Sequence, residues 1–141
     1  MKRKASAVWR GGLKDGKGTI STESKVLKET QYSFKTRFED GIGTNPEELV
    51  AAAHAGCFSM AFSAELGKVG ITPESIYTIA AITLETSQAG FTVTQSHLEV
   101  TAKVPGADKA RVLDIAKVAK AGCPISRLLN ANISMDVQLW T

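Results

Sequence analysis

The two cysteines of this chain are the residues best suited to carry out chemistry. Cys57 lies in the segment Ala-His-Ala-Gly-Cys-Phe-Ser, and Cys123 lies in Lys-Ala-Gly-Cys-Pro-Ile-Ser. A thiolate is a strong nucleophile, and two thiols that meet in a fold can form and break a disulfide. Three interpretations are open: a working redox pair, a structural disulfide, or two unrelated thiols buried as small apolar groups.

The N-terminal and apolar segments favour a reducing compartment. The basic first residues run into residues 5–12 without the apolar stretch of a secretory signal. The longest apolar stretch, residues 49–66, contains polar side chains and is short for a membrane span. We therefore expect a cytoplasmic protein with no membrane partner. In that compartment a permanent disulfide is uncommon, and paired cysteines are more often catalytic or redox-sensing.

The composition is that of one globular domain. Of the 141 residues, 43% are hydrophobic and 22% are charged, so we expect a single domain that covers residues 1–141. The net charge of +3 comes largely from a cluster formed by Lys2, Arg3 and Lys4. No basic stripe with interleaved aromatic residues follows this cluster, so nucleic acid is not expected as a partner.

The first half of the sequence predicts strands followed by a long helix. A hairpin is predicted from strands at Ala5–Arg10 and Thr19–Thr22, and the strict alternation of Tyr32–Phe38 predicts a third strand. The helix should begin with Asn45 as N-cap and run to about Leu66. If Asn45 is the cap, Glu47 is free for another role. If Thr44 is the cap instead, Glu47 completes a capping box.

The second half predicts a hairpin, a helix and a final strand. Residues 75–86 and 91–104 alternate with β-branched positions, residues 107–121 have helical spacing, and residues 133–140 alternate again. Pro124 should break the second helix. The predicted fold class is therefore α+β, a largely antiparallel sheet with a long central helix and a second helix on one side.

Activation of a thiol requires a nearby cation or base. An unperturbed thiol has a pKa near 8.5, so only about 3% is thiolate at pH 7. The candidate cations are Arg37, and Arg127 close after Cys123, although Arg127 is better explained as a helix-end residue. His54 shares a helix face with Cys57 and is either its base or, in the preferred interpretation, a packed core residue.

Several segments resemble one known family over nearly the whole chain. Residues 44–60 resemble the first signature of the OsmC/Ohr peroxidases, and residues 119–126 resemble the second. Trp9, residues 16–22 and residues 34–39 extend the likeness. The Arg-Phe-Glu and His-Ala-Gly-Cys segments are similar to the OsmC branch of the family.

The resemblance implies an osmotically inducible enzyme that reduces organic hydroperoxides. It implies that Cys57 is the peroxidatic thiolate, which becomes a sulfenic acid, and that Cys123 resolves it as a disulfide. Arg37 is implied as the cation that stabilises the thiolate, and Glu47 as the carboxylate that orients Arg37. The family further implies a lipoyl-type dithiol reductant and an intertwined homodimer, with no cofactor.

The spacing of Glu47 and Cys57 argues for a site shared between subunits. Ten residues on one helix span about 15 Å of its axis, too far for the carboxylate to touch the thiolate of its own chain. We therefore expect composite sites, with Arg37 and Glu47 supplied by the partner subunit. The alanine-rich helix would permit the close packing that this needs.

The substrate pocket and the rival functions follow from the same motifs. Residues close to the motifs are candidates for an apolar pocket that favours organic hydroperoxides over hydrogen peroxide, namely Phe38, Ile42, Phe58, Met60 and Ile125. Zinc binding by Cys57, His54, Cys123 and His97 has no recognised spacing. The rivals to an enzyme are a redox sensor that does not turn over and a structural domain with inert thiols.

Overall fold

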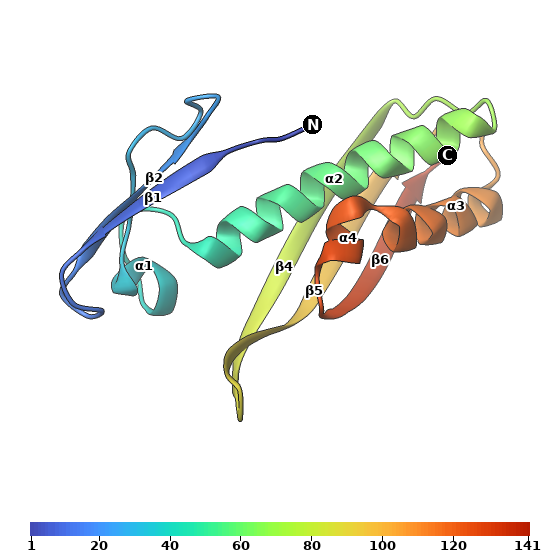
Figure 1. Ribbon diagram of the computed structural model, residues 1–141. Helices are drawn as coiled ribbons and strands as arrows, with labels where there is room; N and C mark the ends of the chain where they lie inside the picture. The colour runs from blue at the N-terminus through green and yellow to red at the C-terminus, as the bar shows by residue number, and fades with distance from the viewer. The chain divides into compact units, whose positions relative to one another are not determined.

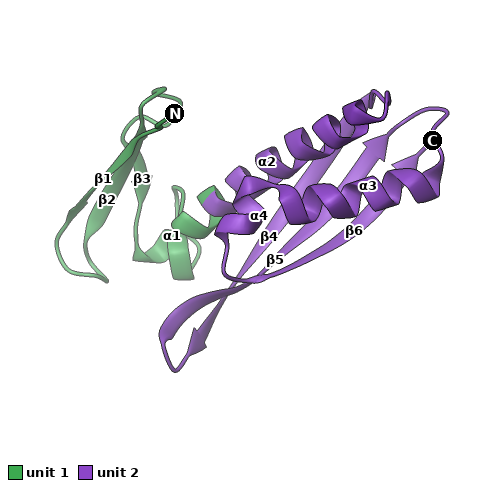
Figure 2. Cartoon of the chain, turned by 45° about the vertical axis from the view of Figure 1, so that its right-hand side comes forward, with its two compact units in different colours: residues 1–49 green, residues 50–141 purple.

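The structure, a computed structural model, describes all 141 residues in two compact units. The first unit comprises residues 1–49 and the second comprises residues 50–141 (Figure 2). Each unit contains its own three-stranded sheet, where one sheet was predicted. The predicted α+β class is confirmed.

The first unit is built on a short antiparallel sheet. Its strands are β1 (Ala5–Arg10), β2 (Lys17–Thr22) and β3 (Thr30–Tyr32), which lie in that order. Gly18 of β2 lies opposite Trp9 on one side and Tyr32 on the other. The two rings approach to 5.4 Å between centroids, and a Cβ at position 18 would collide with both. Glycine is therefore required at this position.

The predicted strand at Tyr32–Phe38 is wrong. Strand β3 ends at Tyr32, and a short helix, α1 (Phe34–Phe38), follows. Ser33 caps this helix: its hydroxyl accepts from the backbone N–H of Thr36, and its own backbone N–H donates to the Thr36 hydroxyl. Phe34 and Phe38 are alternating positions but also helical neighbours, with ring centroids 4.8 Å apart. The capping box decided between two patterns that the apolar spacing alone could not separate.

The long helix α2 (Pro46–Lys68) begins where the sequence predicted. The backbone N–H of Glu48 donates to Asn45 Oδ1 at 2.8 Å, so Asn45 is the N-cap. The side-chain amide of Asn45 also donates to the Thr36 carbonyl at 2.8 Å, which ties α1 to the start of α2. Thr44 donates to the Glu48 carboxylate instead of capping the helix. Glu47 is therefore left out of the cap.

The second unit is a mixed sheet covered by helices. Strands β4 (Ser75–Ser87) and β5 (Gly90–Lys103) form the predicted hairpin, and β6 (Asn132–Trp140) pairs with β5 in parallel. The parallel pairing follows because the chain crosses over through α3 (Lys109–Gly122) and α4 (Pro124–Leu128) before it returns. In Figures 1 and 2, α2 and α3 lie side by side on one face of this sheet.

The core of the second unit lies between these helices and β5. Phe58, Phe62 and Leu66 recur at every fourth position of α2 and are fully buried. They pack with apolar residues of β5 and α3, which are Leu98, Val100, Ala102, Val112, Ala116 and Ala119. The 23 residues of α2 are long and apolar enough to span a membrane, by length and composition alone. The expectation of no membrane span rested only on the apolar residues 49–66.

We predict that Asn45→Ala lowers the free energy of unfolding by about 1 to 2 kcal/mol, because it removes both the cap and the bond to Thr36. Asn45→Asp is the matched control: its carboxylate still caps α2 but cannot donate to the carbonyl, so its loss should be smaller. Urea unfolding of the three proteins measures the difference. Equal losses in the two variants would mean that the cap contributes nothing.

Candidate active site

The structure brings the two thiols together. Cys57 lies in the middle of α2, half-buried, and Cys123 is the buried residue at the junction of α3 and α4. Pro124 occupies the first turn of α4 and so ends α3 at this point. Both cysteines are free thiols, and the Cys123 thiol donates to the Cys57 sulfur at 2.8 Å. A disulfide bond is about 2.05 Å long, so only a small movement separates this pair from bond formation.

The surroundings of Cys57 favour the thiol over the thiolate. Burial is the main cause that raises the pKa of Cys57, and the hydrogen bond from Cys123 raises it further. The backbone N–H of Ile125 acts in the opposite direction, because it stabilises the thiolate. The pair is therefore placed for disulfide formation, but a peroxidatic thiolate needs an additional source of positive charge.

A second predicted pair forms in the first unit. Arg37 of α1 meets Glu47 in the first turn of α2 through a bidentate ion pair. Its Nε lies 3.1 Å from Oε1 and 3.2 Å from Oε2, and one terminal nitrogen lies 2.7 Å from Oε1. The guanidinium also lies 5.2 Å from the ring centroid of Phe38. These contacts hold the Arg37 side chain, 36% exposed, in one orientation.

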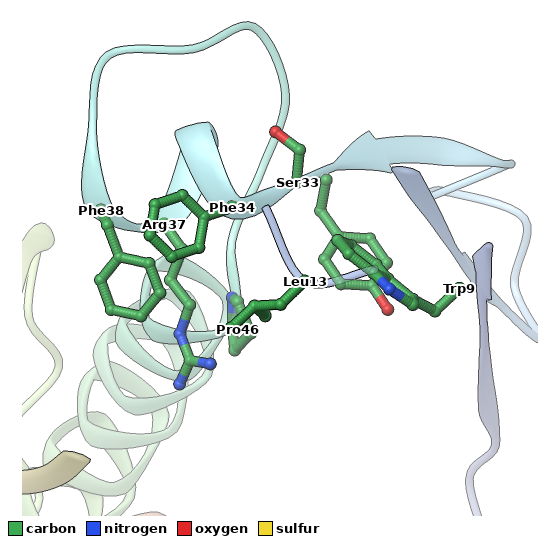
Figure 3. Close-up of a pocket in the computed structure, with 8 residues that line it drawn as sticks. Trp9, Leu13, Ser33, Phe34, Arg37, Phe38 and Pro46 are labelled. Carbon is green, nitrogen blue, oxygen red and sulfur yellow. The ribbon is translucent and has the colours of Figure 1, made fainter. Parts of the chain in front are cut away.

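An apolar pocket of about 280 Å³ lies beside Arg37 in the first unit (Figure 3). In Figure 3 the guanidinium of Arg37 lies beside the ring of Phe38 and extends toward α2. Aromatic and aliphatic side chains form most of the wall, and the lining residues are Trp9, Leu13, Tyr32, Ser33, Phe34, Arg37, Phe38 and Pro46.

This pocket differs from the one predicted from the sequence. Of the predicted residues, only Phe38 lines it. Phe58 belongs to the core of the second unit, and Ile125 packs against that core. Ile42 and Met60 are exposed. The hairpin of β1 and β2 places Trp9 and Leu13 in the wall of this pocket. Trp9 stands out in the sequence only through the family resemblance, and no sequence signal pointed to Leu13.

His54 is a buried structural residue rather than a base for Cys57. It is 0% exposed, and its ring nitrogens are both engaged at 2.7 Å. Nδ1 meets the Ser96 hydroxyl of β5, and Nε2 meets the Ser126 hydroxyl of α4. Burial lowers the pKa of His54, which keeps the ring neutral. The preferred interpretation of His54 from the sequence, a packed core residue, agrees with these contacts.

The remaining candidates are His97 and Arg127. His97 follows Ser96 on β5 and so points to the opposite face of the sheet, where it contacts Ser134 and Asp136. No group of three or more His, Cys, Asp or Glu side chains is placed to hold a metal ion. Arg127 is exposed in the last turn of α4. These positions do not add a ligand or a base to the site.

The fold and the site define a small α+β protein with a close pair of free cysteines. Residues 39–138 match the family model described as OsmC-like protein, so the chain belongs to the OsmC-like family, as predicted. Peroxiredoxin OsmC of Escherichia coli strain K12 is 52% identical over 137 residues, which cover 97% of this chain and 96% of the relative. An organic hydroperoxide resistance protein of Xanthomonas axonopodis is 31% identical over 70% of this chain and 68% of the relative.

Solved structures agree on the fold. An OsmC-like protein from Mycoplasma pneumoniae superposes with a TM-score of 0.78 at 15% identity, covering 100% of this chain and 99% of the other. The organic hydroperoxide resistance protein OhrB of Bacillus subtilis superposes with a TM-score of 0.70 at 21% identity, covering 96% and 98%. The predicted OsmC-like architecture of the chain is confirmed.

We predict that His54 makes stability depend on pH. Its pKa lies below the ordinary value of 6.5, so the unfolded chain binds a proton that the folded chain does not. Stability is therefore complete above pH 6.5 and falls as the pH drops below it, by up to about 1.4 kcal/mol per unit. Urea unfolding between pH 7 and pH 5 measures this slope.

The chain contains only two histidines, which supplies a matched control. His54→Gln should flatten the pH dependence in this range, although the variant is less stable at pH 7. His97→Gln should retain it. A slope that survives in His54→Gln would assign the effect to another group.

Proposed function

We propose that this protein is a thiol-dependent peroxidase that reduces organic hydroperoxides to alcohols, with Cys57 as the attacking residue and Cys123 as the resolving residue. The observation that carries the proposal is the 2.8 Å approach of two free thiols inside the fold. The family and the names of its relatives, a peroxiredoxin and organic hydroperoxide resistance proteins, support the same reaction class.

The reaction proceeds in three balanced steps. The Cys57 thiolate attacks the terminal oxygen of the hydroperoxide, the O–O bond breaks, and the alkoxide leaves as the alcohol after it takes a proton. Cys57 is then a sulfenic acid. The Cys123 thiol attacks this sulfur, the S–S bond forms and water leaves. An external dithiol, proposed to be lipoyl-type, reduces the disulfide by thiol exchange and is itself oxidised.

The cation that Cys57 lacks is proposed to be Arg37 of a partner subunit. The bidentate contact with Glu47 keeps the guanidinium of Arg37 in a fixed orientation. About 15 Å of helix separates Glu47 from Cys57 on the same chain, so the Cys57 that Arg37 serves is proposed to belong to the other subunit. We propose an intertwined homodimer with two composite sites, in which residues 1–141 act as one OsmC-like domain. Of the 23 residues of α2, only His54, Phe58, Phe62 and Leu66 are buried within the chain, and a Cβ at Gly56 would meet nothing within 4 Å. This uncovered surface supports close packing of a second copy.

The pocket beside Arg37 is proposed to hold the alkyl part of the substrate. Its wall is mostly aromatic and aliphatic, and buried apolar surface contributes about 25 cal/mol per Å². Hydrogen peroxide has no apolar group to place there, so organic hydroperoxides should be preferred. The need for reduced thiols in each cycle favours the cytoplasm as the working compartment.

We predict many turnovers of cumene hydroperoxide per site with a lipoyl-type dithiol as reductant. Cys57→Ser should abolish peroxide consumption. Cys123→Ser should consume about one equivalent per chain and then stop as a sulfenic acid or a more oxidised form. Peroxide assays and mass spectrometry of the two variants measure these outcomes. Consumption by the unmodified protein that stops at one equivalent per site would instead identify a redox sensor.

We predict that Arg37→Ala slows the oxidation of Cys57 by at least about tenfold, because the pKa of Cys57 stays raised without the cation. The rate should then continue to rise at pH values where the unmodified protein has reached its plateau. Stopped-flow oxidation across pH measures both effects. An unchanged rate and pH profile would remove Arg37 from the mechanism.

A mixture of a slow variant and an inactive variant tests the composite site. When Arg37→Ala and Cys57→Ser are refolded together in equal amounts, half of the dimers are mixed and each has one complete site, so about a quarter of the activity should return. Arg37 acting on the Cys57 of its own chain would restore nothing.

A further inference from the structure

The hydrogen bonds of His54 link three elements around the thiol pair. His54 lies on α2 one turn before Cys57, and Ser126 lies on α4 one turn after the junction residue Cys123. The ring contacts Ser126 through Nε2 and the strand residue Ser96 through Nδ1, each at 2.7 Å. The imidazole is therefore a buried bridge from the sheet, through the helix of one cysteine, to the helix that starts at the other.

We infer that His54 is a positioning residue for the resolving step: its bond to Ser126 holds α4 against α2 and thereby keeps the Cys123 thiol within reach of the Cys57 sulfenic acid. This inference rests on the proposed roles of the two cysteines. It assigns to His54 no contact with the peroxide.

Helix α4 contacts the rest of the second unit through few groups: Ile125 packs against the core and its backbone N–H reaches Cys57, and Ser126 meets His54. It has five residues, and an isolated helix of that length is not stable in water. Pro124 interrupts the hydrogen-bond ladder from α3, so α4 is not a continuation of that helix. Ser126 is the one buried residue of α4, whereas Leu128 is 73% exposed. The single buried side chain of α4 is thus the one that meets His54.

The chemistry of the three groups suits a fixed bridge. A neutral imidazole has one donor and one acceptor, and a hydroxyl can serve as either, so both ring nitrogens are satisfied in either tautomer. No buried side-chain nitrogen or oxygen atom in the structure lacks a partner. The bond to Ser96 fixes the orientation of the imidazole ring against β5. The ring then presents Nε2 to the Ser126 hydroxyl in a fixed direction. Because both nitrogens are engaged, His54 has none free to take the proton of Cys57. Its effect passes through the position of α4 and should be larger on resolution than on the first oxidation.

The test separates the two chemical steps in the reduced protein. One equivalent of tert-butyl hydroperoxide is added with and without dimedone, which traps sulfenic acid, and mass spectrometry follows the dimedone adduct and the disulfide. Ser126→Ala should slow disulfide formation at least about tenfold and raise the trapped fraction toward that of Cys123→Ser. The first oxidation should slow much less, and only because α4 also carries the Ile125 N–H that stabilises the Cys57 thiolate. Ser96→Ala, which leaves the bond to α4 in place, should slow disulfide formation much less.

A pair of substitutions at position 54 repeats the test from the other side. An asparagine amide can replace Nδ1 and a glutamine amide can replace Nε2, so His54→Asn keeps only the bond to Ser96 and His54→Gln keeps only the bond to Ser126. Disulfide formation should be slower in His54→Asn than in His54→Gln. This comparison also serves if Ser126→Ala does not fold.

The outcomes distinguish this inference from the function on which it rests. Disulfide formation at the unmodified rate in Ser126→Ala, or equal slowing of both steps, would overturn the positioning role. For the substitutions at position 54, equal rates in the asparagine and glutamine variants would do the same. If the unmodified protein itself forms no sulfenic acid or disulfide, the proposed function fails instead.

Discussion

Burial of the Cys57 thiol is the constraint on which the rest of the site depends. The fold encloses Cys57 and Cys123 until their sulfurs are 2.8 Å apart, which favours a rapid disulfide. The same burial raises the pKa of Cys57 and disfavours the thiolate that peroxide chemistry needs. The proposed role of Arg37 follows from this conflict, since a desolvated thiol becomes nucleophilic only when positive charge is brought to it.

Side-chain hydrogen bonds hold the elements of both units that carry the proposed site residues. Asn45 caps α2 and donates to the Thr36 carbonyl, which fixes α1 against the start of α2. The backbones that carry Arg37 and Glu47 are therefore held in place. In the second unit, His54 binds hydroxyls of a strand and of a short helix. In each case a neutral polar side chain orients the element that carries a reactive group. Burying these polar side chains costs little free energy when every donor and acceptor has a hydrogen-bond partner.

The fold was predictable where local signals agreed and unpredictable where they competed. The start of α2, the hairpin of β4 and β5, and the break at Pro124 each had turn or cap residues that matched the apolar spacing. Residues 32–38 fitted a strand and a helix equally, and the capping box settled the matter. The apolar pocket was misplaced because Phe58, although close in sequence to Cys57, points into the core.

The sequence by itself determined the chemistry: two cysteines in glycine-flanked motifs, an arginine and a carboxylate able to pair with it, and an α+β order of elements. These are properties of residue types and short spacings. Only the tertiary structure decided that the sulfurs meet, that β6 runs parallel to β5, and that His54 is a bridge rather than a base. Each of these depends on which distant segments pack together, and packing is set by burial across the whole unit rather than by any local pattern.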